Sequence, residues 1–138
     1  MLVTQGFIPN IDRKKVFENV LKSTEQELIV VSPYISATGI ETIDLNLNDI
    51  SKLKLVTKLS VRDCVFGAYA PETVLNFILS RHKGECCPKI WVNQRLHAKC
   101  YIFDRKVSIM GSLNLTHGGL TKNREMAYLF KGKTAKSP

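Results

Sequence analysis

Residues 27–36, ELIVVSPYIS, place the strongest constraint on the fold, because every position from Leu28 to Val31 is apolar and Ser32-Pro33 follows. A strand with one solvated face alternates apolar and polar residues, whereas a continuous apolar run is typical of a strand covered on both faces. The run therefore predicts a central strand in a sheet that other layers cover.

Helical and strand patterns alternate along the rest of the chain. A helix is expected over 11–23, and another begins at Pro71 with four apolar residues in phase, Val74, Leu75, Ile78 and Leu79. A further helix is expected at 38–48, and strands at 53–60, 89–93, 96–104, 106–112 and 124–130. Because the last strands follow one another closely, we predict an α/β (α+β) fold, a mixed β-sheet flanked by helices on both faces.

The length and the charge distribution limit the possible classes of protein. The chain has 138 residues, and we expect one domain over residues 1–131 followed by a tail or linker at 132–138. Residues 1–69 carry eight basic and eight acidic side chains, whereas residues 70–138 carry twelve and four, so the second half holds the whole net charge of +8. The positive electrostatic field of such a basic half attracts the phosphates of nucleic acid or of a membrane surface. A basic face that only maintains solubility is the alternative.

The four cysteines indicate a reducing environment. Cys64, Cys86, Cys87 and Cys100 lack the Cys-x-x-Cys spacing of zinc sites, and adjacent cysteines rarely form a disulfide. We expect reduced thiols. The sequence opens with no signal-peptide pattern and contains no window long and apolar enough for a membrane span, so it predicts a soluble, cytoplasmic protein.

The segment LHAKCYIFD at 96–104 interrupts an apolar strand pattern with polar residues. Period-two alternation places His97 and Lys99 on one face, about 7 Å apart. An ammonium disfavours protonation of a nearby imidazole; a neutral imidazole can act as nucleophile or general base, while the ammonium binds an anion. The next turn adds the hydroxyl of Ser112 and the amide of Asn114, which completes a candidate oxyanion-binding set for a phosphoryl centre. A surface pair without a catalytic role is the alternative.

The stretch that includes these residues resembles the HKD signature of the phospholipase D superfamily. The matching residues, at the family's spacing, are His97, Lys99, Asp104, Gly111, Ser112 and Asn114. The resemblance implies that His97 attacks the phosphorus and forms a phosphohistidine, while Lys99 and Asn114 bind the non-bridging oxygens with help from Ser112. It also implies that Glu125 orients the imidazole, and that Asp104 and Gly111 are structural.

The signature occurs once in this chain, whereas the active site of the superfamily uses two. The resemblance therefore implies a homodimer with a shared site, and it requires no metal or other cofactor. Short members of the superfamily resemble nucleases, including the catalytic domains of metal-independent restriction endonucleases, and we expect DNA as the substrate. Candidate DNA-binding residues are Arg62, Arg95, Arg105, Lys122 and Arg124.

A domain of this size has little surface left for reading bases, so we expect either a non-specific nuclease or a cleavage domain whose sequence specificity comes from a fused or separate DNA-recognition domain. Two alternatives stay open. One is a phospholipid phosphodiesterase, and the other is a non-catalytic module that binds nucleic acid on the same fold.

Overall fold

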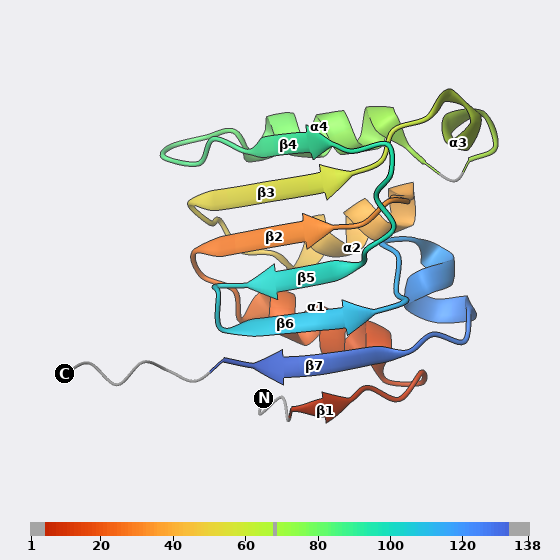
Figure 1. Cartoon of the computed structure of the whole chain (residues 1–138). Helices are drawn as coiled ribbons and strands as arrows, with labels where there is room; N and C mark the ends of the chain where they lie inside the picture. Colours follow the sequence, from red (N-terminus) through yellow and green to blue (C-terminus); the bar gives the residue numbers. More distant parts are fainter. Residues whose placement is uncertain (1–4, 68, 133–138) are drawn as a thin grey trace.

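The computed structural model describes residues 5–67 and 69–132 (Figure 1). Its strands form one seven-stranded sheet in the order β1-β7-β6-β5-β2-β3-β4. The strands are β1 (Gly6–Phe7), β2 (Glu27–Val31), β3 (Lys52–Thr57), β4 (Lys89–Val92), β5 (Cys100–Phe103), β6 (Val107–Gly111) and β7 (Ala127–Lys131). The helices are α1 (Arg13–Lys22), α2 (Ala37–Asn46), α3 (Val61–Val65), α4 (Pro71–Arg81) and η1 (Gly118–Lys122), a single π-helical turn. Apart from Gly132, the tail expected at 132–138 lies outside the described residues.

The directions of the strands bring distant segments together at one end of the sheet. β2, β3 and β4 are parallel, whereas β5 is antiparallel to β2, β6 to β5, and β7 to β6. The carboxyl ends of β2, β3, β4 and β6 therefore meet the amino ends of β5 and β7, on the right in Figure 1. We call this the site end. The opposite end holds the tight turn between β5 and β6, and we call it the hairpin end.

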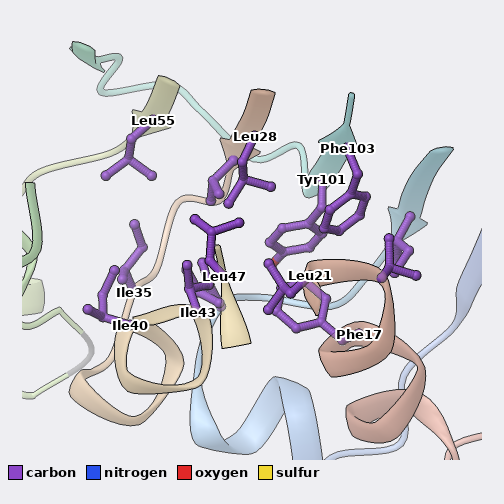
Figure 2. Packing of buried hydrophobic residues seen from close by; sticks show 14 of the residues in the cluster. Phe17, Leu21, Leu28, Ile35, Ile40, Ile43, Leu47, Leu55, Tyr101 and Phe103 are labelled. Carbon is purple, nitrogen blue, oxygen red and sulfur yellow. The ribbon is translucent and has the colours of Figure 1, made fainter. Parts of the chain in front are cut away.

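The core lies between the sheet and helices α1 and α2 (Figure 2). Phe17 and Leu21 of α1 pack against Tyr101 and Phe103 of β5, and all four side chains are fully buried. The rings of Phe17 and Tyr101 meet edge to face, with 5.0 Å between their centroids. Such a pair contributes about 0.5–1.5 kcal/mol beyond the burial of its surface, so it fixes β5, which leads directly from the site end.

The predicted mixed sheet with flanking helices is confirmed, but α1, α2 and α4 all lie on one face rather than on both (Figure 1). The connections β2-α2-β3 and β3-α4-β4 advance across the sheet in the same direction, so right-handed crossovers place both helices on the same side. The strands after β4 are joined without a crossover helix. On the uncovered face, paired positions of the seven strands form an apolar row, Phe7, Tyr128, Met110, Cys100, Val31, Val56 and Trp91.

Cys100 therefore lies half-buried on the uncovered face. None of the helices in the described part of the chain is long and apolar enough to cross a membrane.

Candidate active site

His97 and Lys99 lie at the site end, in the connection that runs from β4 to β5. β5 begins at Cys100, so both residues precede the strand in which the alternation predicted them. Because β2 and β3 lie between β4 and β5, this connection passes the ends of both strands. The imidazole of His97 is exposed, and the ammonium nitrogen of Lys99 is 3.5 Å from each of its ring nitrogens. An accessible imidazole beside a cation can meet an anionic substrate without displacing protein atoms.

Ser112 follows β6, at a backbone position that glycine makes possible. Gly111 has φ +152°, and a Cβ there would collide with the carbonyl oxygen of Met126. This close approach lets the backbone N–H of Ser112 donate to the Met126 carbonyl at 2.8 Å, and the backbone N–H of Met126 donate to the Ser112 hydroxyl at 2.9 Å. The Ser112 hydroxyl in turn donates to the carboxylate of Glu125. β6 and β7 thus position a hydroxyl and a carboxylate together.

Asn114 lies in a segment that the exit of β2 holds in place. The hydroxyl of Ser32 accepts from the backbone N–H of Leu115 at 3.0 Å, and the hydroxyl of Tyr101 donates to the carbonyl of Leu113 at 2.8 Å. Burial raises the pKa of Tyr101, so this hydroxyl stays protonated and keeps donating. The side-chain oxygen of Asn114 is buried and has no hydrogen-bond partner among the described residues.

Glu125 is held from a part of the chain that the sequence patterns did not indicate. Its backbone N–H donates to the side-chain oxygen of Asn10 at 2.9 Å, and the guanidinium of Arg13 donates to the same oxygen at 2.6 Å. Arg13 is buried, with 3% of its surface exposed, and also donates to the carbonyl of Leu120 at 2.9 Å. Arg13 therefore fixes two points of the segment between β6 and β7. Its charge did not single it out, because Lys14 and Lys15 follow Arg13 directly in the sequence.

The carboxylate of Glu125 bonds to Ser112 within the single chain, and no hydrogen bond joins it to His97 among residues 5–67 and 69–132. Its role in orienting the imidazole therefore stays a prediction. The structure brings three further predicted residues to the site end, where His97 and Lys99 also lie: Ser112, Asn114 and Glu125.

Asp104 and Arg105 lie at the hairpin end, across the length of β5 from His97. The Asp104 carboxylate accepts from three successive backbone N–H groups, at residues 25–27, over 2.8–2.9 Å. Burial opposes its ionisation, but these bonds outweigh that effect and lower the pKa of Asp104. Arg105 pairs with the buried carboxylate of Glu27 at 2.7 Å. The structure therefore separates Arg105 from the other predicted DNA-binding residues.

The other predicted cations lie at the site end, and all four are exposed. Arg62 is in α3 after β3, and Arg95 is in the connection from β4 to β5. Lys122 ends η1, and Arg124 follows it two residues later. Cations therefore lie on both sides of His97 in the order of the strands, an arrangement that suits a long polyanion.

Among the described residues, no group of three or more His, Cys, Asp or Glu side chains is arranged to hold a metal ion.

Comparison with solved structures identifies the same fold in several proteins. Nuc from Salmonella typhimurium, described as a phospholipase D family member, has a TM-score of 0.63 and 16% identity over 93% of this chain and 81% of its own. NucT from Helicobacter pylori has a TM-score of 0.59 and 11% identity over 91% and 82%. TrmBL2, an archaeal chromatin protein, has a TM-score of 0.58 and 11% identity over 94% of this chain but only 46% of its own.

The comparison with curated protein sequences gives no match. Residues 17–137 match the family described as "Cardiolipin synthase, PLD-like domain". That match covers most of the chain, including the segments that carry His97, Ser112 and Glu125. The chain belongs to the family of phospholipase D-like domains.

Proposed function

We propose that this protein is a metal-independent phosphodiesterase that cleaves DNA through a phosphohistidine intermediate. The observation that carries the proposal is the meeting at one end of the sheet of an exposed His97, the Lys99 ammonium beside it, and the Ser112 and Asn114 turn. At this end of the sheet these groups supply a nucleophile, a cation and hydrogen-bond donors, which are the requirements of phosphoryl transfer without a metal.

In the proposed reaction a ring nitrogen of His97 attacks phosphorus as the bond from phosphorus to the leaving oxygen breaks. A second imidazole donates a proton to that oxygen and then accepts a proton from water. The water oxygen attacks phosphorus, the phosphorus–nitrogen bond breaks, and His97 is released. Lys99 and the amide of Asn114 stabilise the charge on the non-bridging oxygens. Ser112 assists them when its hydroxyl proton turns from the Glu125 carboxylate to a phosphate oxygen.

The second imidazole is proposed to be His97 of another copy of the chain. The described residues contain two further histidines: His82 follows α4, and His117 lies at the start of η1, where its ring is 3.3 Å from the Thr121 hydroxyl. Neither belongs to a second HKD motif. A two-fold axis at the site end would place two copies of the motif about one phosphodiester, so we propose a homodimer with a shared site.

DNA is the proposed substrate because four exposed cations, Arg62, Arg95, Lys122 and Arg124, extend the site end on both sides of His97. A fused or separate domain is proposed to supply sequence specificity, as in a restriction endonuclease.

Nicking of supercoiled plasmid in EDTA tests the proposal. The wild-type protein is expected to nick the plasmid, and His97→Ala is expected to abolish nicking. His82→Ala is the matched control, since His82 is also exposed but lies outside the motif. Nicking that requires Mg²⁺, or that survives His97→Ala, would contradict the proposal.

A phospholipid phosphodiesterase is the second candidate, favoured by the family description "Cardiolipin synthase, PLD-like domain". Release of a headgroup from phospholipid vesicles, with no nicking of DNA, would select it. DNA binding that persists in His97→Ala, with no turnover by the wild-type protein, would instead select the non-catalytic binding module.

A further inference from the structure

Residues 58–66, which follow β3 at the site end, form a projecting lobe that includes α3; we call it the α3 lobe (Figure 1). Its apolar side chains are unusually accessible: Val61 is 81% exposed, Val65 73% and Phe66 78%. A short helix that leaves this much apolar surface in water gains little stability from its contacts within the chain. Such a surface is typical of a site that another molecule covers.

Two cations in this region each lie over an aromatic ring. The guanidinium of Arg62 is 5.9 Å from the ring centroid of Phe66, and the ammonium of Lys58 is 5.7 Å from that of Tyr34. Lys58 also approaches the carboxylate of Asp63 at 3.8 Å, whereas Arg62 is exposed and contacts the ring of Phe66. Alternating cations and accessible rings form the chemistry of grooves that bind single-stranded nucleic acid, where phosphates meet cations and bases stack on rings.

The α3 lobe is continuous with the candidate active site. Tyr34 follows β2, the strand next to β5, and Lys58 follows β3, the strand after that. At the spacing of strands in a sheet, β3 lies about 10 Å from β5, which a few nucleotides of a chain can span. A polynucleotide whose phosphate reached His97 could therefore pass Tyr34 and Lys58 and arrive at Phe66.

Hydrogen bonds connect the α3 lobe to the chain that follows it and to the exit of β2. The hydroxyl of Ser60 caps α3 by accepting from the backbone N–H of Asp63 at 3.1 Å. The backbone N–H of Tyr69 donates to the carbonyl of Asp63 at 3.2 Å, and the N–H of Ala70 donates to the carbonyl of Ile35 at 2.9 Å. The lobe is thus bonded to Tyr69, and the next residue, Ala70, bonds to the exit of β2.

We propose that the α3 lobe, together with Tyr34, binds single-stranded nucleic acid on one side of the scissile phosphate. An unpaired base stacks on Phe66, and the phosphates beside it contact Arg62 and Lys58. This inference rests on the proposed nuclease function and adds a preference for unpaired substrate. Bases of an intact duplex already stack on their neighbours, so they cannot use the ring.

A comparison of two substrates tests the role of Phe66. One is a single-stranded oligonucleotide that reaches the lobe, and the other is bis(4-nitrophenyl) phosphate, which is too small to do so. In Phe66→Ala, the ratio of kcat/KM for the oligonucleotide to kcat/KM for the small diester is expected to fall about tenfold, mainly through KM, because stacking on an aromatic ring contributes that much binding. Phe130→Ala is the matched control, an exposed phenylalanine of β7 that is expected to leave the ratio unchanged. An unchanged ratio in Phe66→Ala would overturn the inference.

Binding to the inactive His97→Ala protein separates this inference from the proposed reaction. Fluorescence anisotropy is expected to show tighter binding of a labelled single strand than of the same strand in a duplex, with the preference lost when Phe66→Ala is added. If the wild-type protein cleaves neither substrate but this preference is observed, the proposed reaction fails and the lobe inference stands. Equal binding of both DNAs, or binding of anionic phosphatidylglycerol vesicles that depends on Phe66 while single strands do not bind, would overturn the inference.

Discussion

The two ends of the sheet both carry charged side chains, but they differ in how those side chains are bonded. At the hairpin end, Asp104 accepts three backbone hydrogen bonds, and Glu27 pairs with Arg105 at 2.7 Å and with Lys54 at 3.4 Å. At the site end, His97 is exposed and its contact is with Lys99. This pair contains no anion, so the Lys99 ammonium is left without an acidic partner among the described residues. Charges with complete sets of partners stabilise the fold, whereas charges without them are available to a substrate.

The largest expected effect is on catalysis at the site end. Lys99→Ala removes the cation beside His97, and we expect kcat for DNA nicking to fall by about 10²–10³-fold with little change in thermal stability. Lys106→Ala, an exposed lysine at the hairpin end, is the matched control and is expected to retain activity. Equal losses of kcat in the two variants would contradict the conclusion that only the site end has charges available to a substrate.

The next effect is on stability at the hairpin end. Asp104→Ala leaves three backbone N–H groups without their acceptor, and we expect the free energy of unfolding to fall by about 2 kcal/mol, measured by urea denaturation. Asp104 also has φ +55°, a conformation that aspartate tolerates better than alanine. The control is Asp12→Ala, because Asp12 precedes α1 without a side-chain capping bond. A folded Asp104→Ala protein of unchanged stability would contradict the structural role.

A smaller effect is expected from the residue that supports Glu125. Asn10→Ala removes the acceptor shared by the Glu125 N–H and Arg13, and we expect kcat to fall about tenfold through misplacement of Glu125 and Ser112. Asn48→Ala is the matched control, since the Asn48 side chain also makes two hydrogen bonds, by donating to the carbonyls of Lys22 and Thr24, but lies in the loop after α2, outside the site. A loss of stability alike in both variants with no loss of kcat would assign Asn10 a purely structural role.

The smallest effect concerns pH. The hydrogen bond from Arg105 lowers the pKa of Glu27, and backbone bonds lower that of Asp104 against the opposing effect of burial. Both carboxylates therefore contribute stability that is fully present above their unfolded pKa values and is lost as the pH falls through the folded values, below about pH 4. Urea denaturation at pH 7 and pH 3 measures the loss, which is expected to be smaller in Asp104→Asn.

The order of helices and strands could be predicted well because it depends on local patterns. The alternation from 27 to 93 and the close spacing of the later strands both correspond to elements of the structure. The number of covered faces could not be predicted in this way, because it depends on the direction in which each crossover advances. The buried side of α4 was also predicted only in part: Val74 is buried, but Leu75 and Leu79 are exposed, and Arg81 is buried instead.

The residues of the motif could be found because their spacing is a property of the sequence. The placement of His97 and Lys99 before β5 rather than within it could not be predicted, because it depends on where the pairing of β5 with β2 begins. Asn10 and Arg13 were missed because they reach the site through contacts more than 100 residues away in sequence. Arg105 was assigned to DNA because charge alone does not reveal that Glu27 is its partner.

Mixing wild-type and His97→Ala chains tests the central claim, that two copies of His97 act on one phosphodiester, most directly. After the chains have exchanged, nicking in EDTA is measured at constant total protein. If both imidazoles are needed, activity follows the square of the wild-type fraction, so an equal mixture should retain about one quarter of the full activity. Activity that falls only in proportion to the wild-type fraction, to about one half, would show that each chain works alone and would contradict the shared site.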